Sequence, residues 1–145
     1  MEFIAQPAGQ EIDPDTLVQR IPYCRHLGVI ARIDNGLLTL ELPFAPHLIG
    51  NPILPALHGG AIGSLLETAA IAQVIYEVRS VRLPKPVDIT IDYLRSGRAQ
   101  TSYARAHIAK QGRRVVNVHA EMWQEDQAKP IAALRGHMLI DSGEA

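Results

Sequence analysis

The stretch PALHGGAIGSLLET, residues 55–68, contains the most pronounced apolar helix pattern of this chain. Its apolar positions and those that follow, up to residue 70, cover most of the circumference of a helix. The pattern predicts one long helix, from His58 to near Arg79, that is buried on nearly all sides. Glu67 lies in the middle of it. A buried carboxylate without a partner carries a large desolvation cost, which indicates a chemical role.

Strand patterns lie on both sides of the predicted helix. Before it, Asp34-Asn35-Gly36 separates the segments 28–33 and 37–43, and Asn-Gly is a strong hairpin signal. The proline-rich residues 44–57 predict a loop. After it, polar and apolar residues alternate, and we expect a four-strand antiparallel meander over residues 87–94, 98–109, 114–124 and 130–140. The pattern indicates an α+β fold, an antiparallel sheet curling around the helix.

The chain of 145 residues has the size of one domain, residues 1–145. Residues 1–22 are expected to form an N-terminal extension, irregular up to residue 27 apart from a short helix that begins at Asp13-Pro14. Residues 1–10 show no secretory-signal pattern, and we expect no stretch to approach the roughly 20 apolar residues of a membrane span. Cys24 is the only cysteine, which excludes an intrachain disulfide and favours a reducing, cytoplasmic location.

Charge is distributed unevenly along the chain. The formal net charge of −1 argues against a nucleic-acid partner. Residues 79–114 nevertheless hold nine Lys or Arg against two Asp, so an anionic ligand could bind there. The six histidines show no metal-ligand spacing, no nucleotide fingerprint occurs, and Ser64 lacks the context of a nucleophile elbow. We therefore expect no metal and no cofactor.

The start of the predicted helix has the features of an oxyanion site. The first N–H groups of a helix have no intrahelical acceptor and lie at the positive end of its dipole. Gly59 and Gly60 have no Cβ atom and would let a substrate carbonyl approach these groups. The same glycines could instead serve only a tight turn or close packing. Glu67 could likewise reach solvent or pair with an arginine, or it could act as a general base or nucleophile.

The spacing within the helix limits how one site can be built. Seven residues separate Gly60 from Glu67, which is about 10 Å along a helix that rises about 1.5 Å per residue. Gly60 and Glu67 of one chain therefore cannot touch the same carbonyl. Two copies of the helix packed antiparallel about a two-fold axis would place the glycines of one subunit beside Glu67 of the other. The spacing predicts a homodimer with active sites at its interface.

His58-Gly59-Gly60 with an acidic residue nine positions after the histidine resembles the hotdog-fold acyl-CoA thioesterases of the phenylacetate-pathway (PaaI-like, 4-hydroxybenzoyl-CoA thioesterase) type. The similarity extends over residues 23–140 and includes Val87–Tyr93 with the Tyr93-Leu94-Arg95 segment. The resemblance implies the hotdog fold, a sheet wrapped around one long helix, in dimers that share a continuous sheet and commonly form tetramers. It also implies hydrolysis of acyl-CoA, with coenzyme A as part of the substrate.

The resemblance also implies roles for individual residues. Gly59 corresponds to the backbone donor to the thioester oxygen, and Glu67 to the general base or nucleophile. His58 corresponds to the motif histidine, which orients the loop. Asn51 resembles the asparagine that places the carbonyl or the water, although it lies seven residues before the histidine where about six are expected.

An auxiliary hydroxyl of the family has no clear counterpart. Pro86 stands where the family often has a serine or threonine, and Ile71 where some relatives have a threonine one turn beyond the acid. Thr68 points about 100° away from Glu67 and is a poor substitute. Ser64, one turn before Glu67, is the remaining candidate.

A second resemblance leads to an alternative function. The segments 47–55 and 67–73 are similar to motifs of the hydroxyacyl-carrier-protein dehydratases, another hotdog family. The catalytic histidine and glutamate are about fourteen residues apart there, whereas His47 and Glu67 are twenty apart, which favours the thioesterase. His47 remains a candidate at the mouth of the site.

A third alternative is a non-catalytic acyl-CoA-binding or sensing module on the same fold. In either acyl-CoA function, the phosphates of coenzyme A suit basic side chains at the predicted hairpin ends. These candidate residues are Arg95, Arg98, Lys110, Arg113 and Arg114.

Overall fold

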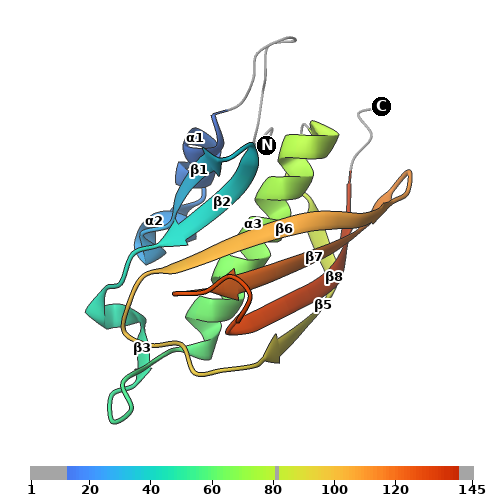
Figure 1. Cartoon of the computed structure of the whole chain (residues 1–145). Coiled ribbons are helices and arrows are strands. Elements are labelled where there is room, and N and C mark those ends of the chain that lie inside the picture. The colour runs from blue at the N-terminus through green and yellow to red at the C-terminus, as the bar shows by residue number, and fades with distance from the viewer. Residues whose placement is uncertain (1–12, 81, 141–145) are drawn as a thin grey trace.

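The structure is a computed structural model that describes residues 13–80 and 82–140. An antiparallel sheet with the strand order β1-β2-β6-β7-β8-β5 wraps around one long helix, α3 (Figure 1). The predicted hotdog arrangement is confirmed. The elements in chain order are α1 (Pro14–Gln19), α2 (Pro22–Leu27), β1 (Ile30–Asp34), β2 (Leu37–Leu42), the 3-10 turn η1 (Pro46–Leu48), β3 (Ile49–Asn51), β4 (Ala56–Leu57), α3 (Gly59–Val78), β5 (Lys85–Tyr93), β6 (Ser102–Gln111), β7 (Val115–Trp123) and β8 (Ala132–Leu139).

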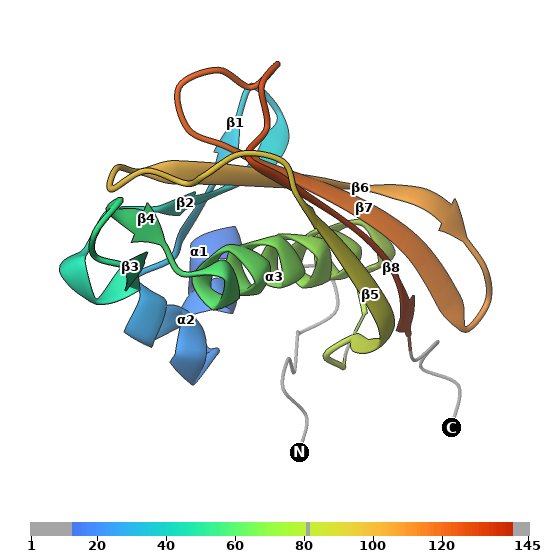
Figure 2. The same cartoon turned by 90° about the horizontal axis from the view of Figure 1, so that it is seen from below.

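The core lies between α3 and the concave face of the sheet. Figure 2 shows α3 running along this face, with α1 and α2 beside it. Leu65, Leu66 and Val74 of α3 are fully buried, as are Val118 and Met122 of β7. The alternation along each strand sends one set of side chains into this core and leaves the other set on the convex face.

The expectation that no stretch approaches a membrane span is wrong for α3. The helix has 20 residues and is apolar enough to cross a membrane by length and composition. Its most apolar window is nevertheless 61% buried inside the fold. The apolar residues of α3 are therefore accounted for by the core that the sheet builds around them.

The predicted four-strand meander is wrong for its first strand. β6, β7 and β8 are consecutive neighbours, but β5 pairs with β8, so that Thr90 lies opposite Arg135. β6 pairs instead with β2 of the first hairpin. The segment after β5 does not turn back on it, because Leu57 donates its N–H to the Gly97 carbonyl and ties this segment to β4. Tertiary contacts therefore override the local turn signal at Ser96-Gly97.

Short elements in two segments of the chain were also missed in the expected layout. The segment 44–57 is not only a loop, because it contains η1 and the β3–β4 pair. Residues 22–27 form a second short helix, α2, which ends at Gly28 with a left-handed φ of 83°. In both segments the sequence patterns are too short to predict structure by themselves. These elements form because they pack on the core.

Other expectations for the first third of the chain are confirmed. Asn35 and Gly36 have φ values of 50° and 77°, which is the geometry of a two-residue hairpin turn between β1 and β2. Asp13 caps α1, and its carboxylate accepts hydrogen bonds from the hydroxyl and N–H of Thr16, which lower the pKa of Asp13. Residues 1–12 of the expected N-terminal extension lie outside the described residues.

Candidate functional site

The start of α3 is held by hydrogen bonds that leave one backbone donor free. His58 is the N-cap: its N–H donates to the Leu48 carbonyl at 2.8 Å, and its ring Nδ1 accepts from the Gly60 N–H at 2.8 Å. The Gly59 N–H has no acceptor among the described residues. Since the Gly60 N–H is already engaged, Gly59 is the donor of this helix start that can polarise a bound carbonyl.

The glycines at the start of α3 also allow close packing against β5. The Tyr93 hydroxyl donates to the Gly59 carbonyl at 2.9 Å. A Cβ atom on Gly59 would lie 3.3 Å from the Tyr93 oxygen, and one on Gly63 would lie 3.0 Å from Cδ1 of Ile91. The glycines of this stretch therefore serve close packing of α3 against β5.

Glu67 lies two turns further along α3, on nearly the same side of the helix as Gly60. Its side chain is half-buried, and no hydrogen bond or ion pair reaches it from residues 13–80 and 82–140. The eight residues between Gly59 and Glu67 correspond to about 12 Å at about 1.5 Å per residue. Within one chain, the carboxylate and the free Gly59 N–H therefore cannot act on one carbonyl.

The two hydroxyls near Glu67 are both bonded to the helix backbone. Ser64 donates to the Gly60 carbonyl at 2.7 Å, on the same side of α3 as Glu67. Thr68 donates to the Ser64 carbonyl at 2.7 Å, and its oxygen lies 3.7 Å from Sγ of Cys24 in α2. Thr68 is therefore buried and in contact with α2, in line with the expected direction of its side chain away from Glu67. Ser64 remains the hydroxyl closest in sequence to the carboxylate on that side.

Cys24 is expected to resist thiol reagents in the folded protein. Its side chain is 1% exposed, and burial raises the pKa of its thiol. Both effects slow the reaction, because the accessible thiolate is the reactive species. Titration with an aromatic disulfide at pH 8 should detect no rapidly reacting thiol in the native protein and one per chain in guanidinium chloride. Rapid labelling of the native protein would contradict this placement of α2.

Asn51 and His47 lie in the segment that leads to α3, and both make local contacts. The Asn51 side-chain oxygen accepts from the Ile53 N–H at 3.0 Å in an exposed turn. His47 Nε2 lies 3.0 Å from the His26 carbonyl, and the two imidazole rings are 5.1 Å apart. Within one chain, neither side chain hydrogen-bonds to the start of α3.

The five basic candidates separate into two groups. Arg95 and Arg98 line a groove of about 740 Å³ next to β4, together with Glu125, Asp126 and Lys129. Arg98 approaches Glu125 at 3.9 Å, and both side chains are exposed, so this pair is weak. The other three lie at the β6–β7 turn, which Figure 2 shows beyond the opposite end of α3: Lys110, Arg113 and Arg114. One chain therefore does not bring the two groups together.

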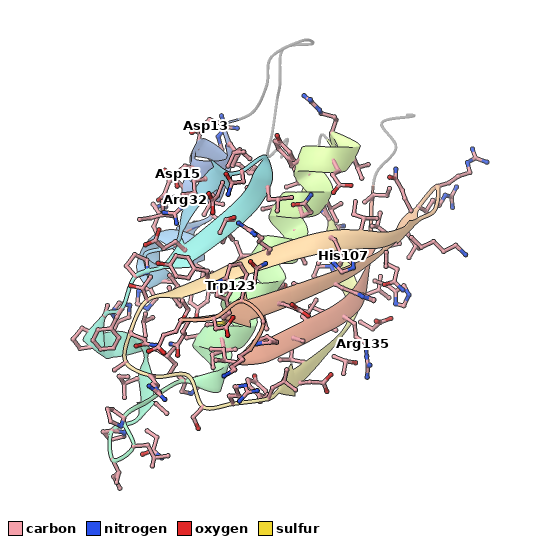
Figure 3. The ribbon with its side chains drawn as sticks, viewed as in Figure 1. Asp13, Asp15, Arg32, His107, Trp123 and Arg135 are labelled. Atoms are coloured by element: carbon pink, nitrogen blue, oxygen red, sulfur yellow. The ribbon has the colours of Figure 1, made fainter. Side chains whose placement is uncertain are left out.

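None of the helices in the described part of the chain covers the convex face of the sheet. His107, Trp123 and Arg135 lie on this face (Figure 3). Trp123 is largely covered by neighbouring side chains, with the Arg105 guanidinium 5.4 Å from its ring centroid. No group of three or more His, Cys, Asp or Glu within residues 13–80 and 82–140 could hold a metal ion.

Tyr93 is the site residue that the sequence interpretation left without a role. The alternation of β5 places it on the same face as Ile89 and Ile91, which pack against the core. This alternation is the sequence signal from which the face of Tyr93 could have been predicted. Its contact with the Gly59 carbonyl required the tertiary structure, because 34 residues separate the two.

Comparison with known proteins identifies a shared family and fold. The family model of the thioesterase superfamily matches residues 54–131, which include the start of α3 and Glu67. The medium/long-chain acyl-CoA thioesterase YigI of Salmonella typhimurium is 27% identical over 139 residues, covering 86% of this chain and 90% of YigI.

Two solved structures are similar to the chain over most of its length. A protein of Chromobacterium violaceum is 42% identical, with a TM-score of 0.72 over 88% of this chain and 89% of that one. The Escherichia coli PaaI protein from the phenylacetic acid degradation operon is 23% identical, with a TM-score of 0.74 over 87% and 88% of the two chains. At this identity, the second likeness concerns the fold.

Proposed function

The chain belongs to the thioesterase superfamily and is a thioester hydrolase, and from this premise we propose that it hydrolyses acyl-CoA to a free acid and coenzyme A. The observation that carries the proposal is the free Gly59 N–H at the start of α3, inside the matched region. The names of the YigI relatives support an acyl-CoA substrate with a medium or long acyl chain.

Gly59 stabilises the charge that develops on the thioester oxygen. When a nucleophile adds to the carbonyl carbon, the oxygen becomes an oxyanion, and a fixed N–H donor stabilises it more than it stabilises the substrate. The positive end of the α3 dipole acts in the same direction. His58 leaves this donor free, because its ring engages the next N–H instead.

Glu67 supplies the nucleophile in one of two ways. As a general base, the carboxylate takes a proton from water while the hydroxide adds to the carbonyl carbon; the C–S bond then breaks and the thiolate receives the proton. As a nucleophile, the carboxylate adds directly, expels the thiolate and forms an anhydride that water hydrolyses. Both routes need a carboxylate that is not held by an ion pair, which agrees with a Glu67 side chain that no other residue of 13–80 and 82–140 binds.

A homodimer completes the site in this proposal. β5 is an edge strand of the sheet, and Val87 and Tyr93 on it are 58% and 56% exposed. Antiparallel pairing of β5 with its copy would continue the sheet and cover these apolar side chains. The same two-fold axis would bring Glu67 of one chain to Gly59 of the other, and two such dimers can form a tetramer.

A complementation experiment tests the shared site. Gly59→Pro removes the donor and Glu67→Gln removes the base, so each variant alone should be nearly inactive. In a dimer that contains one chain of each kind, one of the two sites combines the intact Gly59 and the intact Glu67. Equal co-expression should therefore restore about a quarter of the wild-type activity, since half of the dimers are mixed. Activity that stays at the level of the single variants would show that each site lies within one chain.

A panel of acyl-CoA substrates tests the proposed reaction itself. The panel should contain short, medium, long and aromatic acyl groups, with release of free thiol as the readout. We expect turnover of at least one medium- or long-chain substrate. Acyl-CoA binding without thiol release would favour the sensing module, and loss of water from a hydroxyacyl substrate would favour the dehydratase.

Two further assignments belong to this proposal: the basic residues that bind coenzyme A, and the location of the protein. The cations of both groups, Arg95 and Arg98 on one side and the β6–β7 turn on the other, are available to bind its phosphates in the dimer. The proposed chemistry uses no metal and no cofactor besides coenzyme A in the substrate. A cytoplasmic location agrees with the free, buried thiol of Cys24.

A further inference from the structure

We infer that Tyr93 is a positioning residue, which acts together with His58 to hold the Gly59–Gly60 peptide in one orientation. The inference rests on the proposed function, because it concerns the donor that the reaction uses. It assigns a role to a hydroxyl that lies at the start of α3 but does not belong to the motif around His58.

The peptide bond is planar, so the groups at its two ends turn together. The Gly59 carbonyl and the Gly60 N–H belong to the same peptide plane. The carbonyl accepts from the Tyr93 hydroxyl at 2.9 Å, and the N–H donates to His58 Nδ1 at 2.8 Å. The plane is therefore held at both of its polar ends by two side chains that come from different parts of the fold.

Two hydrogen bonds of this kind restrict the backbone where a pair of glycines would otherwise leave it free to move. Two consecutive glycines have more backbone freedom than any other pair, and they occupy the first, least constrained turn of a helix. The Gly59 N–H is only one residue away from the anchored peptide, so its direction follows the orientation of that peptide. A donor aimed in advance at the oxyanion needs no reorganisation during the reaction, which is the condition for large electrostatic stabilisation.

The position of Tyr93 indicates that this side chain does more than fill the core. Its ring and hydroxyl lie against Gly59, where an added Cβ atom would come within 3.3 Å of the Tyr93 oxygen, yet Tyr93 is 56% exposed. Tyr93 is also the last residue of β5, the strand proposed to form the dimer interface. The hydrogen bond therefore ties the oxyanion donor of α3 to the edge of the sheet.

Tyr93→Phe tests the inference because it removes the hydroxyl and keeps the ring. We expect kcat to fall about three- to tenfold, as for the loss of one hydrogen bond, while KM stays the same. Tyr103→Phe is the matched control, because Tyr103 lies on β6 and no hydrogen bond of its hydroxyl occurs within the described residues. An unchanged kcat in Tyr93→Phe would overturn the inference.

A double-mutant cycle with His58→Ala separates positioning from a merely structural effect. If both side chains hold one peptide, the double variant should lose clearly less kcat than the product of the two single losses. The cycle of His58→Ala with Tyr103→Phe should be multiplicative. Multiplicative losses in the Tyr93 cycle would overturn the inference. His58→Asn replaces His58→Ala if the latter does not fold, because asparagine caps a helix without reproducing the imidazole geometry.

Amide hydrogen exchange gives a readout that does not depend on turnover. The Gly60 amide should exchange several-fold faster in Tyr93→Phe than in the wild type, although its own acceptor is His58, and it should be unchanged in Tyr103→Phe. Equal exchange in all three proteins would overturn the anchor. A wild type without thioesterase activity would overturn the proposed function, and the Gly60 exchange would still decide whether Tyr93 and His58 hold the peptide.

Discussion

Replacing Gly59 with proline is expected to lower kcat about 10²- to 10³-fold, the loss found when an oxyanion donor is removed. Proline has no N–H, so the substitution deletes the N–H at the start of α3 that has no acceptor in the described part of the chain. The helix should tolerate it, because position 59 is the first residue of α3 and His58 has the extended conformation, with ψ of 132°, that precedes proline. In this chain, α1 and α2 also begin with proline.

Gly59→Ala is the matched control for this variant. Alanine introduces the same Cβ atom, 3.3 Å from the Tyr93 oxygen, but it keeps the N–H. The difference in kcat between the two variants therefore isolates the donor from the steric effect. If Gly59→Ala keeps most of the wild-type kcat and Gly59→Pro turns over equally fast, with both proteins folded by circular dichroism, Gly59 is excluded as the oxyanion donor.

Glu67→Gln is expected to lower kcat about 10²-fold or more and to leave KM largely unchanged, in line with the loss of a general base. Glutamine has nearly the same shape and keeps the half-buried position filled. It cannot accept a proton or form an anhydride. The melting temperature should not fall, because no ion pair or hydrogen bond of Glu67 exists within the described chain to be lost. Steady-state kinetics and thermal unfolding of the purified variant measure both quantities.

Glu77→Gln provides a control in the same helix. Glu77 is exposed near the end of α3 and accepts a hydrogen bond from Gln73, one turn away. The same chemical change there should leave kcat at the wild-type value. Wild-type turnover in Glu67→Gln would remove Glu67 from the mechanism, whereas an equal loss in both variants would point to a general effect on α3.

Much of the candidate site could be predicted from a short stretch of sequence. The N–H groups of Gly59 and Gly60 were predictable as donors because any helix start leaves its first N–H groups without acceptors. Which of the two stays free was not, since His58 is not a usual N-cap residue and the reach of its ring to Gly60 depends on the side-chain conformation. Tyr93 could be placed on the inward face of its strand, but not against a carbonyl 34 residues earlier.

The sequence by itself determined the long buried helix, the hairpin at Asn35-Gly36 and the position of Glu67 along α3, because periodicity and turn chemistry are local properties. Only the tertiary structure decided that β5 does not pair with β6, the next strand in sequence, and pairs instead with β8 at the edge of the sheet. The strands pair in the arrangement that buries the most apolar surface around α3. The amount of buried surface depends on side chains from the whole chain, so a local pattern does not determine it. The same packing brings Tyr93 to Gly59, so the donor that the helix supplies is oriented by a strand whose pairing no local pattern could assign.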